Sequence, residues 1–367
     1  MVPNLRFTNN QLKDFKIVDI CKLKQGNQYD LKQQFTEEKS DLKRFIRIID
    51  YTQKTNDIRY VYSNGSENYV DCTDVVVVRY GASAGYVGRG INGIIANNLF
   101  TIRPINSALL NKSYLYHYLN APVIQKQLNN TQSSGMPALN FQTINNLHIL
   151  LPEYQEQRQI AVFLDKIDER IQTQIKIIDD YNSLKMGIYN CMFKENYADY
   201  KLKQLAYIVK GDQINNDQLL SNGSYYMMNG GASPSGYLDS YNVSENTISI
   251  SEGGNSCGYV QFNSSPFWSG GHCYTIQNVN SALIENKYLY HYLKYKEKEI
   301  MNLRIGTGLP NIQKKDLENF TILVPSLLIQ RKNLALFEML DEKISILNEE
   351  LANLQKQKKY LLCNMFI

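Results

Sequence analysis

An internal duplication is the feature that most constrains how this chain of 367 residues can fold. The segment 107–119, Ser-Ala-Leu-Leu-Asn-Lys-Ser-Tyr-Leu-Tyr-His-Tyr-Leu, recurs with few changes at 281–293. The same offset of 173 or 174 positions relates glycines and prolines on both sides of this segment, and it continues without a break from Pro152 to Phe193 of the first copy. Two unrelated domains would not share so long a correspondence, so we predict a tandem duplication.

Each copy is expected to begin with a globular part of mixed composition. Runs rich in β-branched residues, followed by Gly-rich turns, predict strands over 73–79 and 247–251. The recurring segments 107–119 and 281–293 have the spacing of helices. A chain with 43% hydrophobic residues can bury such cores, and the fronts of both copies are therefore predicted to be α+β domains.

Each copy is expected to end in a long helix, the first from about 157 to 193. Apolar residues alternate in steps of three and four, the a and d positions of a heptad. Gln174, Lys185 and Lys358 interrupt this pattern with polar side chains, which often fix the register of a coiled coil. The predicted seam consists of Leu164, Ile167, Ile171, Ile178, Tyr181, Ile188, Phe337, Leu340, Ile344, Leu347, Leu351, Leu354 and Leu361.

The order of these parts predicts how the helices pair. The second globule follows the first helix and precedes the second, so helices lying side by side must run antiparallel. The expected fold is α+β, with two similar globular domains separated by two long antiparallel helices that form a coiled coil with pseudo-twofold symmetry. The predicted boundaries are 1–152 and 195–325 for the globular domains, and 153–194 and 326–367 for the helices.

Charge is distributed unevenly between the two globular parts. The net formal charge is +4 for the chain, +6 for residues 1–152 and −2 for 195–325. No carboxylate occurs from Val75 to Pro152, a stretch with the cations Arg79, Arg89, Arg103, Lys112 and Lys126. The corresponding stretch from Gly253 to Ile284 has no charged residue and is rich in Asn, Ser, Gln and Tyr. Both stretches suit contacts to phosphates and base edges, although strands and a buried helix would also lack carboxylates.

Several kinds of catalytic site are not supported by the sequence. A Gly-rich phosphate loop of the G-x-x-x-x-G-K-[ST] type is absent, and Gly81 to Gly85 lies between two strand-like runs, as a turn does. His272 and Cys273 have no third partner at a spacing that would make a metal site or an activated nucleophile. His117 and His291 recur within the predicted helices, where packing or capping is expected. Asp168 and Glu169 lie on the first long helix, where pairs between helices are expected.

The six cysteines have no paired C-x-x-C spacing, so we expect reduced thiols rather than a disulfide framework or a zinc ribbon. No apolar run is long enough to span a bilayer, and the first ten residues lack the pattern of a signal peptide. The expected location is therefore the cytoplasm, without a membrane partner.

These features together resemble the DNA-specificity (S) subunit of a type I restriction-modification system, over essentially the whole chain. The string Leu-Pro-Glu-Tyr-Gln-Glu-Gln-Arg-Gln-Ile at 151–160 is similar to the opening of the family's helical spacer. The second copy, at 324–333, departs from the family pattern at Ile329 and Asn333. Gly-x-Pro strings at 134–139 and 307–312 resemble the turn that closes each recognition domain.

The resemblance implies a subunit that catalyses nothing and carries no cofactor. It would bind a split site in double-stranded DNA, one half-site per recognition domain. Two methyltransferase (M) subunits would supply S-adenosylmethionine chemistry, and restriction (R) subunits driven by ATP would join the full complex. The helices would act both as spacer and as docking surface for these partners.

We expect phosphate contacts from the basic side chains Arg79, Arg89 and Lys126. Hydrogen bonds to bases are expected from polar residues of the loops. These candidates are Ser83, Tyr86, Asn97 and Asn98 in the first domain and Asn255, Ser256, Tyr259 and Gln261 in the second. An alternative function is a two-headed adaptor that binds proteins, which a flat dependence of binding on salt would favour. A stand-alone nuclease or methylase has no plausible site.

Overall fold

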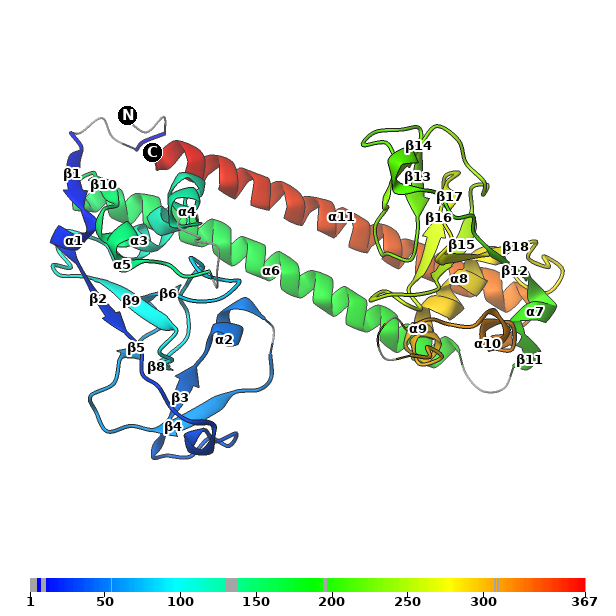
Figure 1. Ribbon diagram of the computed structural model, residues 1–367, viewed down its shortest axis with the longest axis horizontal. Helices are drawn as coiled ribbons and strands as arrows, with labels where there is room; N and C mark the ends of the chain where they lie inside the picture. The colour runs from blue at the N-terminus through cyan, green and yellow to red at the C-terminus, as the bar shows by residue number, and fades with distance from the viewer. Residues whose placement is uncertain are drawn as a thin grey trace. The chain divides into compact units, whose positions relative to one another are not determined.

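The computed structural model describes residues 5–7, 11–53, 55–129, 137–193, 197–306, 308 and 310–366. The chain divides into two compact units, each formed by a globular head and parts of two long helices (Figure 1). Unit 1 comprises Met1–Ile175 and Glu349–Ile367, and unit 2 comprises Lys176–Asn348. The long helices are α6 (Tyr154–Met192) and α11 (Leu327–Met365). We call the part of unit 1 before α6 head 1, and the part of unit 2 between α6 and α11 head 2.

Among its described residues, head 1 contains three antiparallel or mixed sheets and short helices. Its sheets have the strand orders β1-β10, β2-β9-β6-β7 and β4-β3-β8-β5. The elements are β1 (Lys13–Lys16), α1 (Ile17–Ile20), β2 (Cys21–Gln25), η1 (Leu31–Gln33), β3 (Leu42–Ile46), α2 (Ile48–Thr52), β4 (Arg59–Tyr62), β5 (Tyr69–Val70), β6 (Val75–Val78), β7 (Val87–Gly88), β8 (Gly93–Ile95), β9 (Leu99–Pro104), α3 (Lys112–Leu119), α4 (Pro122–Asn129), α5 (Phe141–Asn145) and β10 (His148–Leu151).

Head 2 repeats the same plan with a smaller third sheet. Its sheets have the orders β11-β19, β12-β18-β15-β16 and β14-β13-β17. The elements are β11 (Ala198–Lys201), α7 (Leu202–Leu205), β12 (Tyr207–Lys210), η2 (Asn216–Gln218), β13 (Tyr225–Met228), β14 (Gly236–Leu238), β15 (Thr247–Ser251), β16 (Val260–Asn263), β17 (Trp268–Ser269), β18 (Cys273–Gln277), α8 (Asn286–Tyr295), α9 (Glu297–Met301), α10 (Lys314–Glu318) and β19 (Thr321–Val324).

The two main sheets are equivalent strand by strand. In head 1, β6 pairs antiparallel with both β9 and β7, and β9 pairs with β2. In head 2, β15 pairs antiparallel with both β18 and β16, and β18 pairs with β12. The first strand of each head also pairs with its last one, β1 with β10 and β11 with β19. The expected α+β class with two similar domains is thereby confirmed.

The helix that carries the repeated segment begins later than its sequence suggested. We expected a helix over 107–119, whereas α3 begins at Lys112 because Asn111 accepts hydrogen bonds from the N–H groups of Ser113 and Tyr114. The equivalent helix in head 2, α8, begins at Asn286 rather than at 281. Residues 107–111 and 281–285 instead form turns that contact the long helices.

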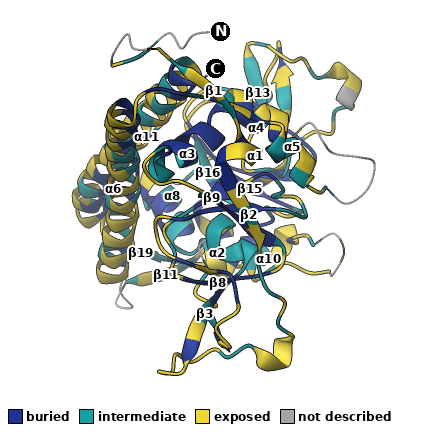
Figure 2. Cartoon of the chain, turned by 90° about the vertical axis from the view of Figure 1, so that its left-hand side faces the viewer, coloured by how far each residue is buried: buried dark blue, intermediate teal, exposed yellow. Residues whose placement is uncertain are grey.

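Each head buries its repeated helix against its main sheet and against the long helices. In head 1, Tyr114 and Leu115 of α3 share a core with Val77 and Phe100, and Figure 2 shows α3 largely in the dark blue of buried residues. The ring of Tyr114 lies 5.2 Å from that of Phe366 at the end of α11. The equivalent rings in head 2, Tyr288 and Phe193, lie 5.5 Å apart. The end of a long helix is thus part of each core.

The long helices run antiparallel within each unit, as the connectivity predicted. In unit 1, Gln174 Nε2 donates to Glu350 Oε2 (3.0 Å), and further along the pair Lys358 contacts Asp168. In unit 2, the Tyr189 and Phe337 rings lie 4.8 Å apart. Every residue of the predicted seam is buried or half-buried, with Leu164, Ile171, Ile178, Phe337, Leu340 and Leu347 in the buried class.

Candidate nucleic-acid interface

A glycine-rich loop follows the central strand of each main sheet in the same conformation. In head 1, Gly85 N–H donates to Val78 O (2.9 Å) and Gly81 N–H donates to Pro137 O (2.9 Å). Gly81 and Gly85 both have φ +89°, a region that favours glycine. This loop carries Ser83 and Tyr86, two of the predicted base contacts.

The loop of head 2 repeats these bonds. Gly258 N–H donates to Ser251 O (2.8 Å) and Gly254 N–H donates to Pro310 O (3.1 Å), with φ +88° and +76° at the two glycines. The prolines belong to the Gly-x-Pro strings, of which residues 134–136, 307 and 309 lie outside the described residues. Asn255, Ser256 and Tyr259 therefore occupy the same loop of head 2 that Ser83 and Tyr86 occupy in head 1.

Arg79 is the first residue after β6 and is held at the base of the loop of head 1. Its N–H donates to Asn98 O (2.9 Å), and its Nη1 donates to Gln25 Oε1 (2.8 Å) at the end of β2. The guanidinium carbon lies 4.7 Å from the ring centre of Tyr80 and 4.3 Å from that of Phe141. These contacts fix the direction of the Arg79 side chain before any ligand binds.

Gln25 joins Arg79 to the predicted residue Asn97. Gln25 Nε2 donates to Asn97 O (2.6 Å), and Asn97 Nδ2 donates to Gln28 Oε1 (2.9 Å). A side chain at Gly26 would not fit, since its Cβ would lie 2.2 Å from Ala96 O. The structure thus joins Arg79 to Asn97 through Gln25, and the Arg79 backbone N–H contacts Asn98 O directly.

Sequence reasoning missed Gln25 and Gln28, although a signal was present. The start of head 1 also recurs in head 2, at an offset of 185 rather than the 173 of the later segments. Asp-Phe-Lys-Ile at 14–17 corresponds to Asp-Tyr-Lys-Leu at 199–202, and Gly26 corresponds to Gly211. That correspondence would have aligned Gln25 with Lys210.

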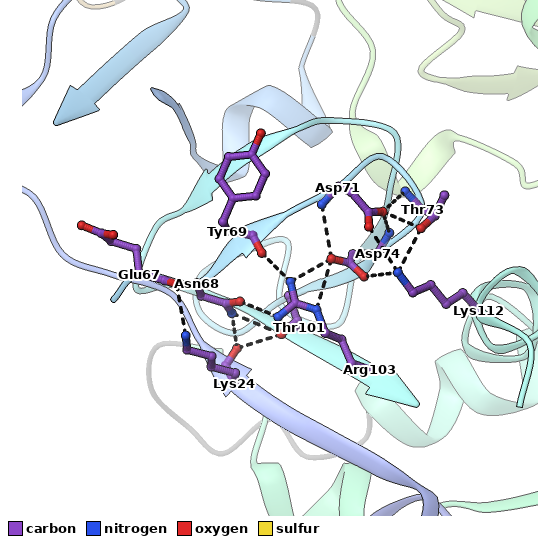
Figure 3. A network of polar contacts seen from close by, with 10 residues as sticks. All are labelled: Lys24, Glu67, Asn68, Tyr69, Asp71, Thr73, Asp74, Thr101, Arg103 and Lys112. Atoms are coloured by element: carbon purple, nitrogen blue, oxygen red, sulfur yellow. Dashed lines mark hydrogen bonds and ion pairs between the residues drawn. The ribbon is translucent and has the colours of Figure 1, made fainter. Parts of the chain in front are cut away.

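Two of the five cations of the carboxylate-free stretch, Arg103 and Lys112, form ion pairs within head 1. Figure 3 shows Arg103 and Lys112 around Asp74, with Arg103 Nη2 at 2.8 Å and Lys112 Nζ at 2.7 Å from its carboxylate. Lys112 also contacts Asp71 (3.3 Å), and a hydrogen bond from Thr73 helps to lower the pKa of Asp71 to about 2. These two cations stabilise the head rather than project from it.

Arg89 lies at the junction between head 1 and α6. It follows β7, which pairs antiparallel with β6, so it lies at the opposite end of this hairpin from Arg79. Its guanidinium contacts Asp165 and Ser113 and stacks 3.9 Å above the Tyr116 ring. Asp165 also accepts a hydrogen bond from the buried His117 (2.7 Å). Arg79 and Lys126 are the cations of this stretch that form no ion pair with any described residue.

Tyr86 and Lys126 are both exposed. Tyr86 is 42% exposed, and its hydroxyl donates to Tyr51 O (3.2 Å). Lys126 lies on α4, and its neighbour Gln125 donates to Gly85 O (3.3 Å), which attaches α4 to the loop. The loop of head 1 and the exposed face of α4 are therefore adjacent.

Head 2 places a carboxylate where head 1 has Arg79. Glu252 follows β15 as Arg79 follows β6, and its N–H donates to His272 O (2.9 Å). Lys210 Nζ at the end of β12 contacts Glu252 Oε1 (2.6 Å), and His272 Nδ1 lies 3.6 Å from Oε2. Sequence reasoning rejected His272 as a nucleophile or metal ligand and did not consider it together with Glu252.

The other predicted residues of head 2 surround the same loop. Asn255 is exposed and Ser256 is half-buried. The Tyr259 ring lies 4.1 Å from Lys294 Nζ. Gln261 lies within β16 opposite Ser249, and its buried Oε1 has no hydrogen-bond partner among the described residues.

The described part of the chain contains no cluster of three or more His, Cys, Asp or Glu residues that could hold a metal ion. Within the same residues, no helix has the length and apolar character needed to cross a lipid bilayer.

Comparison with known proteins identifies the class. A family model described as the type I restriction modification DNA specificity domain matches residues 9–179 and 194–356. A putative type I specificity subunit of Mycoplasma pneumoniae is 34% identical over 155 residues, which cover 42% of this chain and 41% of that protein. The MjaVIII specificity subunit of a type I restriction enzyme from Methanocaldococcus jannaschii is 23% identical over 352 residues, with coverage of 83% and 80%.

A second Mycoplasma relative, a putative type I specificity subunit of Mycoplasma genitalium, matches over 35% of this chain and 33% of its own length. The chain thus spans less than half the length of these two Mycoplasma relatives in the matched regions. Among solved structures, an S subunit of a type I restriction-modification system from M. genitalium superposes with a TM-score of 0.67 at 20% identity, covering 100% of this chain and 99% of that one.

The two matched regions define the class: each head, together with part of a long helix, matches a DNA specificity domain. The chain belongs to the family of the type I restriction modification DNA specificity domain and carries two copies of that domain. Specificity subunits of this family carry no cofactor of their own.

Proposed function

We propose that this chain binds double-stranded DNA at a bipartite site, with one half-site for each head, and directs the enzymes of a type I restriction-modification complex to it. The observation that carries the proposal is the loop that follows β6 and β15. Its backbone hydrogen bonds are the same in both heads, whereas its polar side chains differ. One framework presenting two sets of side chains suits recognition of two different sequences.

The proposed recognition domains are 1–152 and 195–325, and the proposed spacer helices are 153–194 and 326–367, with the seam described above. Phosphate contacts fall to Arg79 and Lys126, since Arg89 is engaged by Asp165 at the head–helix junction. Base contacts fall to Ser83, Tyr86, Asn97 and Asn98 in head 1 and to Asn255, Ser256, Tyr259 and Gln261 in head 2.

The proposed partners are two methyltransferase subunits and, in the full complex, restriction subunits. S-adenosylmethionine and ATP would bind to those partners, and the assembly would act on DNA in the cytoplasm. The long helices expose large apolar side chains such as Val162 (52%), Met339 (60%) and Tyr360 (62%), which supports a protein-binding role for them. A solved structure that superposes with a TM-score of 0.53 at 16% identity is described as concerning complex assembly of the type I R-M system.

The proposal is tested by co-expressing the chain with its neighbouring methyltransferase and mapping methylated bases by sequencing. We expect a bipartite motif that disappears when this chain is deleted. Exchange of head 1 for that of another specificity subunit should change one half of the motif and leave the other unchanged. Methylation that is indifferent to both changes would refute the proposed function.

A further inference from the structure

In both heads, the residue that follows the central strand forms a hydrogen bond with a residue at the end of a second strand, but the donor and acceptor roles are reversed between the heads. In head 1, Arg79 after β6 donates to Gln25 at the end of β2 (2.8 Å). In head 2, Glu252 after β15 accepts from Lys210 at the end of β12 (2.6 Å). The backbones are equivalent, because Leu139 N–H donates to Arg79 O and Ile312 N–H donates to Glu252 O, each at 2.8 Å. The same framework therefore presents a donor in one head and an acceptor in the other.

The two oxygens of Glu252 have different surroundings. Oε1 accepts from Lys210 Nζ (2.6 Å) and from Tyr274 Oη (3.1 Å). Oε2 faces His272 Nδ1 at 3.6 Å and accepts no hydrogen bond from any described residue. The side chain is only 10% exposed, and a carboxylate oxygen removed from water gains from a further donor. Oε2 is thus an acceptor that remains available.

A cavity of about 480 Å³ opens onto Glu252. Its lining includes Lys210, Asn229, Gly230, His272 and Asn311. Lys210 and His272 are 52% and 62% exposed and so form the outer part, whereas Glu252 lies at the inner end. Gly230 has φ +79°, and a Cβ there would lie 3.1 Å from the Cβ of His272, so a larger residue would narrow the cavity. The cavity therefore combines an inner acceptor with outer donors.

We propose that this cavity recognises one base of the second half-site, and that the base carries an exocyclic amino group in the major groove. This inference rests on the proposed function. The amino groups at adenine N6 and cytosine N4 can donate a hydrogen bond to the carboxylate oxygen Oε2. Guanine O6 and thymine O4 are themselves acceptors, so they cannot form this hydrogen bond. In head 1 the equivalent Arg79 favours guanine, whose O6 and N7 are both acceptors. The equivalent positions of Arg79 in head 1 and Glu252 in head 2 thereby determine which base each head recognises.

The first test is to compare methylation motifs of the wild-type complex with those of Glu252→Gln and of the control Glu245→Gln, an exposed carboxylate of the same head. We expect E252Q to reduce discrimination at one position of the second half-site by roughly tenfold or more, as loss of one good base contact does. The first half-site should not change. The control should leave both half-sites unchanged, and Arg79→Gln should affect the first half-site alone.

The outcomes separate the inference from the function on which it rests. Absence of a bipartite motif with the wild-type chain would defeat the proposed function. A bipartite motif in which folded E252Q recognises the second half-site like wild type would overturn the inference alone.

A second test keeps the wild-type protein and so does not depend on the folding of a variant. Binding of the chain with its methyltransferase is measured on duplexes in which single adenines of the second half-site are replaced by purine, and single cytosines by 2-pyrimidinone, each lacking only the amino group. One such replacement should weaken binding roughly tenfold and show whether the base is adenine or cytosine. Binding unaffected by every replacement would overturn the inference.

Discussion

Lys358 of α11 forms an ion pair with Asp168 of α6 in unit 1. The duplication repeats this pair, because Lys185 of α6 binds Asp341 of α11 in unit 2. Each lysine interrupts the apolar seam, and each is largely buried, with side-chain exposures of 20% for Lys358 and 14% for Lys185. The polar positions of the seam therefore have charged partners on the opposite helix, which favours one register over its alternatives.

Removing one member of the pair should destabilise unit 1. We expect Asp168→Leu to lower the free energy of unfolding by about 1–3 kcal/mol, between the values for exposed and for fully buried pairs, because Lys358 keeps its charge without a partner. Adding Lys358→Met should restore part of this loss in a double-mutant cycle. Lys359→Met, which changes an exposed neighbour, is the control, and equal effects of K358M and K359M would contradict the assigned role.

A buried glutamine joins each head to the helix that follows it. Gln330 is 0% exposed, accepts from Glu285 N–H (2.8 Å), and donates to Leu283 O (2.9 Å) and Pro325 O (2.8 Å). Gln157 makes the equivalent three contacts in head 1, to Asn111, Leu109 and Pro152. The glutamine of the spacer-like string thus has a structural explanation. Its side chain forms hydrogen bonds with backbone groups of the turn that precedes α3 or α8.

We expect Gln330→Leu to lower the free energy of unfolding by about 2–4 kcal/mol, because it leaves three buried or part-buried backbone groups without their partner. Denaturant titration of the purified chain measures this change. Gln355→Leu alters an exposed glutamine of the same helix and should shift the midpoint little. If the two variants unfold alike, the three contacts contribute nothing to stability.

Acid should weaken the junction between head 2 and α6 through His291. His291 Nδ1 is 2.8 Å from the hydroxyl of Tyr189, which donates to the neutral ring, and burial together with Lys185 and Lys287 lowers the pKa of His291 from 6.5 to about 3. The unfolded chain takes up a proton below pH 6.5 that the folded chain does not. Stability should therefore fall as the pH drops from about 6.5 toward 3, by roughly 2 kcal/mol at pH 5 from this residue.

His291→Gln should reduce this pH dependence between pH 8 and pH 5, as measured by denaturant unfolding at each pH. His148→Gln is a suitable control, because its ring is 55% exposed and pairs with Asp14 at the surface. An acid sensitivity that persists unchanged in H291Q would show that other groups cause it.

The sequence predicted the parts of the fold whose signal is local or repeated. The duplication, the heptads and the antiparallel connectivity indicated two similar heads and two paired helices. The start of α3 was wrong by five residues because the side chain of Asn111, rather than the apolar periodicity, determines where the helix begins.

The site was less predictable because it depends on contacts between distant strands. Gln25 and Arg79 come from strands that are separated by β9 in the sheet, and neither residue has a motif of its own. Charge counting grouped Arg89 and Lys112 with Arg79, although the first two are neutralised by Asp165, Asp71 and Asp74. Composition shows which charges exist, whereas only the fold shows which of them are paired.

The difference between paired and unpaired cations predicts unequal roles for the cations of head 1 in DNA binding. Lys126 is exposed and forms no ion pair with a described residue, so Lys126→Gln should weaken binding of the assembled complex to all sequences alike. The slope of log K against log salt should become less steep by about 0.9 per lost phosphate contact.

Lys112→Gln is the control. It removes a cation from the same stretch that is already bound to Asp71 and Asp74, so the slope for this variant should match that of the wild type. Equal slopes for K126Q and the wild type would exclude Lys126 from the phosphate contacts, and a reduced slope for K112Q would mean that the cluster around Asp74 opens when DNA binds.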